Sequence, residues 1–390
     1  MYDAIIVGAR CAGAPLAMLL SRKGHRVLLV DKASFPSDRI STHFIMQAGL
    51  ARAKGWGLLP KICALGAPLI RRGHMDADDG EFSGYPPPMD GIDYAVAPRR
   101  TRLDQLLVDE AVSAGVEFRE GLYVEGVLTE ADRVTGVRGH SPRGTLVTER
   151  ATIVVGADGP ASVVARTVGA GKYQERLSSG GAYYAYWDGV PQGRDFEMYV
   201  RPGYGGVRFP TNEGLTCIVG GWSEEAFGRR CSPAEGYRAY LQAIPRLAEV
   251  LIAAKQVEPL KGMQALHGYF RQSWGPGWAL AGDAGYHKHP ISAQGISDAF
   301  REPIRWLKRS TPVSRDEQKW TRRCRSISRI AMRPSCRCIR VRVSGPSCSH
   351  SRLRSAPCSG HCGKTRKLPT GFSASTQGPF RFRSFSRLTI

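Results

Sequence analysis

Three short blocks of glycine and aspartate stand out, each directly after a run of apolar residues. The first is Gly-Ala-Arg-Cys-Ala-Gly, from Gly8 to Gly13, and Asp31 closes the next apolar run. A glycine turn between a strand and a helix brings helix amides onto a pyrophosphate, and an acid at this distance accepts hydrogen bonds from ribose hydroxyls. The block therefore predicts a dinucleotide site, although a plain strand-helix turn is the alternative.

One residue of this block departs from the usual fingerprint. Arg10 stands where the second glycine is expected. Its side chain would crowd a pyrophosphate unless it points away, whereas its charge is suited to pairing with a phosphate. The sequence leaves both placements open.

The other two blocks each place an acid in a glycine turn. Gly156-Ala-Asp158-Gly159 follows the apolar residues 153–155, and Gly282-Asp283-Ala284 follows the apolar residues 278–281. An ordinary Asp-Gly turn is the alternative reading of the second block.

The elements that must position these blocks are those of a doubly wound parallel sheet. Strands are expected at 4–7, 26–30, 116–118, 151–155 and 278–281, with helices over 14–22, 102–114 and from 290 to 300. Because an open α/β sheet binds its ligand at the carboxyl ends of its strands, the three blocks should converge there.

Two other segments have a different character. Residues 66–97 and 176–264 alternate aromatic and small residues between glycines and prolines, with one helical stretch at 233–254. This pattern predicts antiparallel strands of a second, inserted domain. The expected fold is α/β, a Rossmann-like domain (1–65, 98–175 and 265–300) with an inserted antiparallel β-sheet substrate domain (66–97 and 176–264).

In this order the three blocks resemble the superfamily of FAD-dependent aromatic hydroxylases (para-hydroxybenzoate hydroxylase-like) and geranylgeranyl reductases, over about residues 1–300. The resemblance implies FAD, with its pyrophosphate on the first block and its adenosine ribose at Asp31. Asp283 would bind the ribitol chain, and amides near Gly295 would face the flavin pyrimidine, since a helix N-terminus favours the negative charge of reduced flavin. The implied cofactor-binding residues are Gly8, Ala9, Arg10, Ala12, Gly13, Asp31, Lys32, Arg39, Arg100, Asp158, Gly282, Asp283 and Gly295.

Two charged residues in that set have specific implied roles. Arg100 matches the family arginine that reaches the flavin nucleotide, although a solvated charge beside Arg99 and Arg102 is the alternative. Asp158 resembles the family acid that contacts both FAD and the nicotinamide cofactor. No second dinucleotide fingerprint is present, which suits a family in which NAD(P)H has no domain of its own.

A histidine and an aromatic set are expected on the substrate side. His43, in Arg-Ile-Ser-Thr-His, is a candidate proton relay, although a lone histidine is more often structural. Tyr183, Tyr184, Tyr186, Trp187 and Phe209 would line the inserted sheet, with half of them in ordinary core. The family pattern Gly-Asp-Ala-Ala-His becomes Gly-Asp-Ala-Gly-Tyr-His here, which leaves the role of His287 open. The Trp-x-Trp-x-Ile-Pro signature of flavin halogenases is absent, which disfavours halogenation.

The basic character of the chain lies in its last 90 residues. The 390 residues carry a net charge of +21, but residues 301–390 hold 22 Lys and Arg against 3 Asp and Glu, leaving +2 on residues 1–300. We expect 301–390 to be a disordered, low-complexity tail. An Arg-rich nucleic-acid-binding arm is one alternative, and the spacing of the tail's six cysteines fits no usual zinc finger.

A shift of reading frame near Arg301 explains the tail best. No acid occurs among the 73 residues after Glu317, and the resemblance stops at Phe300, inside a helix that should continue. Asp and Glu codons need a central adenine that a displaced frame of a GC-rich gene seldom supplies. This hypothesis puts the helices that finish the flavin domain in doubt.

These observations favour a cytoplasmic FAD-dependent monooxygenase. Four scattered cysteines in residues 1–300 suit a reducing compartment, and no export leader or membrane span is visible. NAD(P)H would reduce the flavin, O2 would add at C4a, and the hydroperoxide would hydroxylate an apolar or aromatic small molecule; no metal is expected. The alternatives are a geranylgeranyl-reductase-like reductase of isoprenoid double bonds, an inactive truncated flavoprotein, or an Arg-rich nucleic-acid-binding protein.

Overall fold

The computed structural model describes residues 1–176, 180–191, 195–223, 226, 232–264, 267–290 and 293–307, with side chains up to residue 301. The basic tail, its cysteines and the outcome of a frame shift therefore lie mostly outside the described residues. Residues 301–307 were expected to belong to the tail, but they continue helix α9 (Gly295–Leu307), which begins five residues later than expected.

The first sheet has the parallel order that the apolar runs predict. Its strands follow the order β17 (Trp274–Gly275), β18 (Trp278–Leu280), β8 (Leu146–Gly156), β1 (Tyr2–Val7), β2 (Val27–Val30) and β5 (Glu117–Arg119). From β18 to β5 every pairing is parallel, with Ile6 opposite both Leu29 and Val155. The carboxyl ends of β1, β8 and β18 thus lie side by side.

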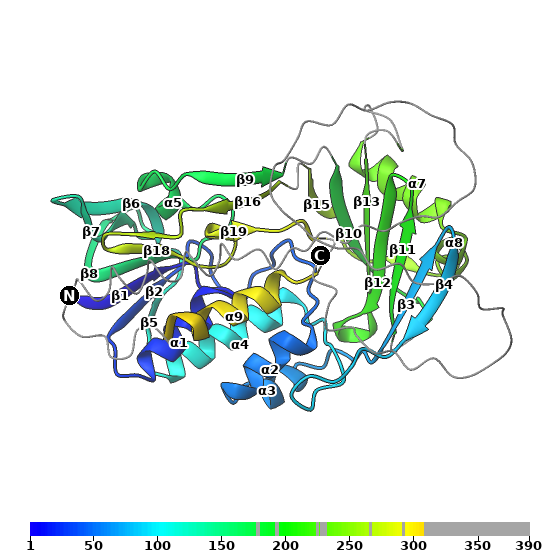
Figure 1. The fold of residues 1–390 in the computed structure, drawn as a ribbon, viewed down its shortest axis with the longest axis horizontal. Coiled ribbons are helices and arrows are strands. Elements are labelled where there is room, and N and C mark those ends of the chain that lie inside the picture. The colour runs from blue at the N-terminus through cyan, green and yellow to red at the C-terminus, as the bar shows by residue number, and fades with distance from the viewer. Residues whose placement is uncertain are drawn as a thin grey trace, which may run out of the picture. The chain divides into compact units, whose positions relative to one another are not determined.

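Alternation along these strands determines what covers each face of the sheet. Ile6, Leu29 and Val155 pack with α1 (Gly13–Ser21), α4 (Arg100–Ser113) and α9, which run together along one face (Figure 1). The neighbouring Ile5 and Val154 pack on the opposite face, under β6 (Tyr123–Glu130), β7 (Arg133–His140) and α5 (Val163–Thr167). Both faces of the sheet are therefore buried, as is usual for a parallel sheet.

The second sheet joins two separate segments of the chain. Its order is β14 (Lys255–Gln256), β10 (Gly181–Asp188), β13 (Thr216–Trp222), β12 (Tyr204–Pro210), β11 (Asp195–Arg201), β3 (Arg72–Ala77) and β4 (Gly80–Gly84), and β15 (Lys261–Gln264) also pairs with β10. The expectation of a purely antiparallel sheet is wrong at one pairing, because β3 runs parallel to β11. No hairpin joins these two strands, so turn geometry does not set their direction.

The outer face of this sheet carries two helices. The stretch expected as one helix over 233–254 is divided into α7 (Pro233–Ala243) and α8 (Pro245–Val250). Pro245 lacks the N–H that would continue α7 and instead begins α8. Tyr240 and Leu247 anchor the two helices in the core beneath them.

A smaller sheet and two helices were not anticipated. The small sheet has the order β19 (Tyr286–His287), β16 (Gly268–Arg271) and β9 (Lys172–Arg176), and α2 (Gln47–Gly55) and α3 (Leu59–Cys63) follow β2. Within the described part of the chain, no helix is long and apolar enough to cross a membrane. The expected α/β class, with a Rossmann-like sheet and an inserted β-sheet, is confirmed.

Candidate functional site

The three glycine blocks meet at the carboxyl edge of the first sheet. A Cβ on Gly8 would stand 2.4 Å from the carbonyl oxygen of Ala157, and a Cβ on Gly282 would stand 2.9 Å from the Cβ of Ala12. Gly8 and Gly282 also have positive φ, at 105° and 60°. These glycines let the turns pack backbone against backbone, so the predicted convergence is present in the structure.

The first block positions the start of α1 and the acid behind it. Asp31 is nine-tenths buried and accepts hydrogen bonds from the amides of Ala9, at 2.8 Å, and Ala33, at 2.9 Å. Lys32 is exposed beside it. No described side chain caps the N-terminus of α1 at Ala12. Ala14 already donates to the carbonyl of Arg10 at 3.0 Å and Pro15 has no N–H, so the amides of Ala12 and Gly13 are what this helix end offers to an anion.

The structure decides between the two placements of Arg10. Its guanidinium donates to Asp104 at 2.5 Å and to the hydroxyl of Ser37 at 2.8 Å, and it lies over the ring of Phe35. The side chain therefore turns away from the glycine turn toward α4. The direct phosphate contact implied for Arg10 thus gives way to a structural pairing, because Asp104 captures the charge.

Asp104 also holds Arg100. The Arg100 guanidinium donates to both carboxylate oxygens, at 3.0 and 2.9 Å, and Arg100 is 7% exposed. The solvated-charge alternative for Arg100 is excluded by this burial. Burial also raises the pKa of the Cys11 thiol, which contacts the same carboxylate, to about 12, so Cys11 stays protonated.

The other two acids have unused hydrogen-bonding capacity. Asp158 accepts from the Val163 amide through Oδ2 at 2.6 Å, while its Oδ1 is buried without a partner among the described residues. Asp283 is exposed, yet protein atoms crowd it closely enough that desolvation raises its carboxyl pKa, against the opposing charges of His287 and Arg100.

Arg39 and Gly295 complete this edge. The Arg39 guanidinium lies 4.0 Å from the Cβ position of Gly159, and its charge acts on Asp283. Gly295 begins α9 and is exposed, with no described atom within 4 Å of its Cβ position, whereas Ile296 and Ser297 beside it are buried. The start of α9 at Gly295 is therefore open to solvent.

His43 lies against Tyr186 of β10, in a strained turn. The φ of His43 is 59°. The amide of Phe44 donates a hydrogen bond to the carbonyl oxygen of Thr42 at 2.6 Å, which closes a three-residue turn around His43. Nε2 lies 2.7 Å from the Tyr186 hydroxyl, while Nδ1 is buried without a partner in the described chain. Burial, with the charge of Arg100, lowers the pKa of His43 to about 3, so the imidazole is neutral at ordinary pH.

The aromatic residues of β10 divide as alternation predicts. Tyr184 and Tyr186 face the first domain and stack edge-on with His43, whereas Tyr183 and Trp187 face the helices of the outer side. The Tyr184 hydroxyl is buried and has no partner within the described residues.

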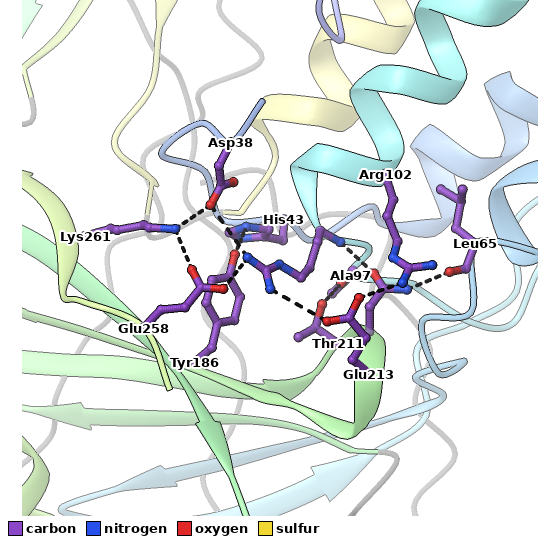
Figure 2. A network of polar contacts seen from close by, with 12 residues as sticks. Asp38, His43, Leu65, Ala97, Arg102, Tyr186, Thr211, Glu213, Glu258 and Lys261 are labelled. Atoms are coloured by element: carbon purple, nitrogen blue, oxygen red, sulfur yellow. Dashed lines mark hydrogen bonds and ion pairs between the residues drawn. The ribbon is translucent and has the colours of Figure 1, made fainter. Parts of the chain in front are cut away.

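A network of charges beside Tyr186 was not expected from the sequence (Figure 2). Lys261 of β15 bonds Asp38, which follows β2, and Glu258, at 2.5 and 2.7 Å, and Arg99 bonds Glu258 at 2.5 Å. The Arg99 guanidinium also lies 4.3 Å from the centroid of the Tyr186 ring. These contacts tie the loop carrying His43 to the second sheet.

Sequence reasoning could have found only part of this network. Arg99 was noted merely as a neighbour of Arg100, and its own partner is 159 positions further along the chain, which no local pattern reveals. Asp104 was the better clue, since an acid four residues after an arginine on a helix signals an ion pair.

A family comparison shows the family to which the chain belongs. The family model described as "FAD binding domain" matches residues 1–302. The chain belongs to this FAD-binding family. The uncapped start of α1 at Ala12 and Gly13, the unpaired Oδ1 of Asp158 and the carboxylate of Asp283 fit FAD, because they offer an anion site and hydroxyl acceptors along one edge.

Curated relatives of the chain include monooxygenases. A rifampicin monooxygenase of Streptomyces venezuelae is 29% identical over 43% of this chain and 34% of its own length. A kynurenine 3-monooxygenase of Salinispora arenicola is 26% identical over 77% of this chain and 70% of its own. The matches to three curated relatives of the chain span between about a third and three fifths of those relatives' own lengths.

Solved structures share the fold. The flavin-dependent brominase Bmp2 matches with a TM-score of 0.74 and 21% identity, over 84% of this chain and 83% of that one. At this identity the likeness establishes architecture alone.

Proposed function

We propose that this protein is an FAD-dependent, NAD(P)H-dependent monooxygenase that hydroxylates an apolar or aromatic small molecule. The observation that carries the proposal is that His43, which feels the charge of Arg100, contacts Tyr184 and Tyr186 of the second sheet edge-on. The family match and the kynurenine 3-monooxygenase relative support it.

FAD would be held by groups from all three turns. The α1 amides and the glycine turn would take the pyrophosphate, Asp31 the adenosine ribose, and Asp283 the ribitol chain. Arg100, fixed by Asp104, would place its charge at the flavin nucleotide, and the α9 amides at Gly295 would stabilise negative charge on reduced flavin. Arg10 would act indirectly, by holding Ser37 and Phe35.

The substrate would lie against an apolar layer with few polar groups. Phe44, Phe196 and Phe209 stack with one another between the second sheet and the first domain, and Ala293 joins them. Such a layer favours an apolar or aromatic molecule and excludes water.

His43 and the two tyrosines would bind the polar part of that substrate. A neutral imidazole offers one donor and one acceptor, and Tyr186 uses only Nε2. Nδ1 of His43 and the Tyr184 hydroxyl remain to hydrogen-bond a ligand, and a proton on the imidazole can pass between its two sides. Bound flavin supplies the redox chemistry, accepting hydride from NAD(P)H and activating O2.

The relatives suggest two other activities. A digeranylgeranylglycerophospholipid reductase is among the relatives, 28% identical over 43% of this chain. Halogenation, the activity of other relatives, is disfavoured because Trp274 and Trp278 pack in the β17–β18 hairpin and do not form the halogenase signature. We also place the protein in the cytoplasm, since its described cysteines are free thiols.

Purified full-length protein tests the proposal. We expect a yellow protein with a flavin absorbance spectrum and O2 consumption driven by NADH or NADPH. NAD(P)H oxidation that reduces a geranylgeranyl substrate without consuming O2 would favour the reductase instead. A colourless protein that cannot be loaded with FAD would overturn both, and would leave the truncated-flavoprotein and nucleic-acid readings.

A further inference from the structure

Strand β16 reaches across to two of the three turns. Tyr269 and Arg271 are two residues apart on this strand, so their side chains lie on one face. The Tyr269 hydroxyl lies 2.8 Å from the carbonyl oxygen of Asp283 and 3.3 Å from that of Pro160. Arg271 donates to the carbonyl of Ala284 at 3.1 Å and to that of Pro160 at 3.0 Å.

These contacts begin where the sheet stops holding the turns together. The ladder between β18 and β8 ends at Leu280 opposite Gly156, followed by one more bond from the Ala281 amide to Gly156. Beyond that bond, the carbonyl oxygens of Pro160, Asp283 and Ala284 accept hydrogen bonds from side chains of β16.

The side chains that make these contacts are themselves held in place. Tyr269 is 5% exposed, stacks on His287 of β19, and lies beneath the cations of Lys172 and Arg271, at 4.7 and 4.8 Å from its ring centroid. Burial raises the pKa of its phenol to about 12, with the carboxylates of Asp283 and Asp158 contributing. Tyr269 therefore remains a hydrogen-bond donor and lies between the two acids.

We propose that Tyr269 and Arg271 are positioning residues that set the separation of Asp158 and Asp283, and thereby the geometry of the FAD site. The inference rests on the assignment of these two acids to FAD. Neither side chain needs to touch the cofactor. Each holds a backbone carbonyl of an acid-bearing turn, and for Asp283 it is the carbonyl of the acid itself.

The consequences differ between the two residues. Tyr269→Phe removes one hydroxyl and leaves the ring stacked, so the FAD dissociation constant should rise about three- to tenfold. Arg271→Met removes the donor to the Ala284 carbonyl and the shorter of the two contacts to the Pro160 carbonyl, and it leaves only the Tyr269 hydroxyl to link the two turns. A rise of roughly ten- to a hundredfold is therefore expected. Arg271→Lys should fall between wild type and Arg271→Met, because one ammonium lacks the planar fork that spans two turns.

The experiment uses the full-length chain, stripped of flavin and titrated with FAD by fluorescence, with visible circular dichroism of the flavin recorded at saturation. Tyr2→Phe and Arg201→Met are matched controls. Tyr2 is equally buried and bonds Glu117 at 2.6 Å in the first sheet, and Arg201 bonds Asp76 in the second sheet at 2.7 Å. The controls should lower the melting temperature yet leave FAD affinity and the dichroism unchanged.

Three outcomes decide the matter. Weaker FAD binding with altered dichroism in the β16 variants alone supports the proposal. Wild-type affinity and dichroism in those variants, or equal losses in the controls, overturns it while leaving FAD binding intact. A wild-type chain that takes up no FAD overturns the assignment of the acids, and with it the positioning role.

Discussion

At the scale of single residues, the buried carboxylate of Asp104 pairs with two cations, the partly buried Arg10 and the buried Arg100. Its side chain has no exposed surface, and both Arg10 and Arg100 bond it. Removing the charge of a buried partner leaves the remaining charges uncompensated, which costs about 3 to 5 kcal/mol. Asp104 therefore determines both where Arg10 points and where Arg100 stands.

A double-mutant cycle measures this coupling. Asp104→Asn should lower the free energy of unfolding of the FAD-free protein by about 3 kcal/mol in urea denaturation. Arg10→Gly, which restores the missing glycine, should recover part of that loss in the Asp104→Asn background, since it removes one uncompensated cation. Strictly additive effects would show that the pair is not coupled.

His43 makes a separate prediction about pH. Its folded pKa of about 3 lies below that of an unfolded histidine, so between these values the unfolded chain binds an extra proton. Its contribution to stability is present above the unfolded pKa and is lost as pH falls toward the folded pKa. From about pH 7 to about pH 5 the loss should be on the order of 2 kcal/mol.

His43→Asn isolates this effect, because asparagine tolerates the positive φ. The other histidines are the same in both proteins, so the difference between the two urea-denaturation series reports His43 alone. The variant should be less sensitive to acid than wild type. Parallel pH profiles would mean that His43 is not held neutral.

At the scale of elements, the strand-turn-helix unit at β1 and α1 depends on Gly13. A Cβ there would stand 1.8 Å from the carbonyl oxygen of Gly8, so Gly13→Ala must displace the turn from the helix. We expect loss of FAD binding and a lowered melting temperature. Gly55→Ala, in an α2 position with no described atom within 4 Å of the new Cβ, should be neutral or stabilise by about 0.5 kcal/mol. Equal effects would contradict the steric account.

Element order and site convergence could be predicted from the sequence, because apolar runs locate buried strands and parallel strands end at one edge. The orientation of Arg10 could not be predicted from the sequence, since its partner Asp104 is 94 positions away. The role of β16 was also missed, because Tyr269 and Arg271 bind backbone carbonyls, which every residue carries. The parallel pairing of β3 with β11 likewise joins segments that no turn connects.

At the scale of the whole molecule, the near-neutral part of the sequence and the FAD family match end almost together. Residues 1–300 carry a net +2, the match ends at residue 302, and residues 301–390 carry +19. An arm selected for binding nucleic acid would not need to begin inside α9. A displaced reading frame would begin wherever the shift occurred, within a helix or not.

Translating the gene beyond codon 300 in its other two frames tests this directly. One frame should give an acidic continuation with helical spacing of apolar residues, which would extend α9 and supply further helices of the flavin domain. Restoring that frame should then tighten FAD binding and raise the melting temperature relative to the present chain, because α9 contributes Phe300 to the core and would be anchored at both ends. If neither frame yields such a continuation, the basic segment is a native part of the protein, and salt-dependent DNA binding by the full chain becomes the measurement to make.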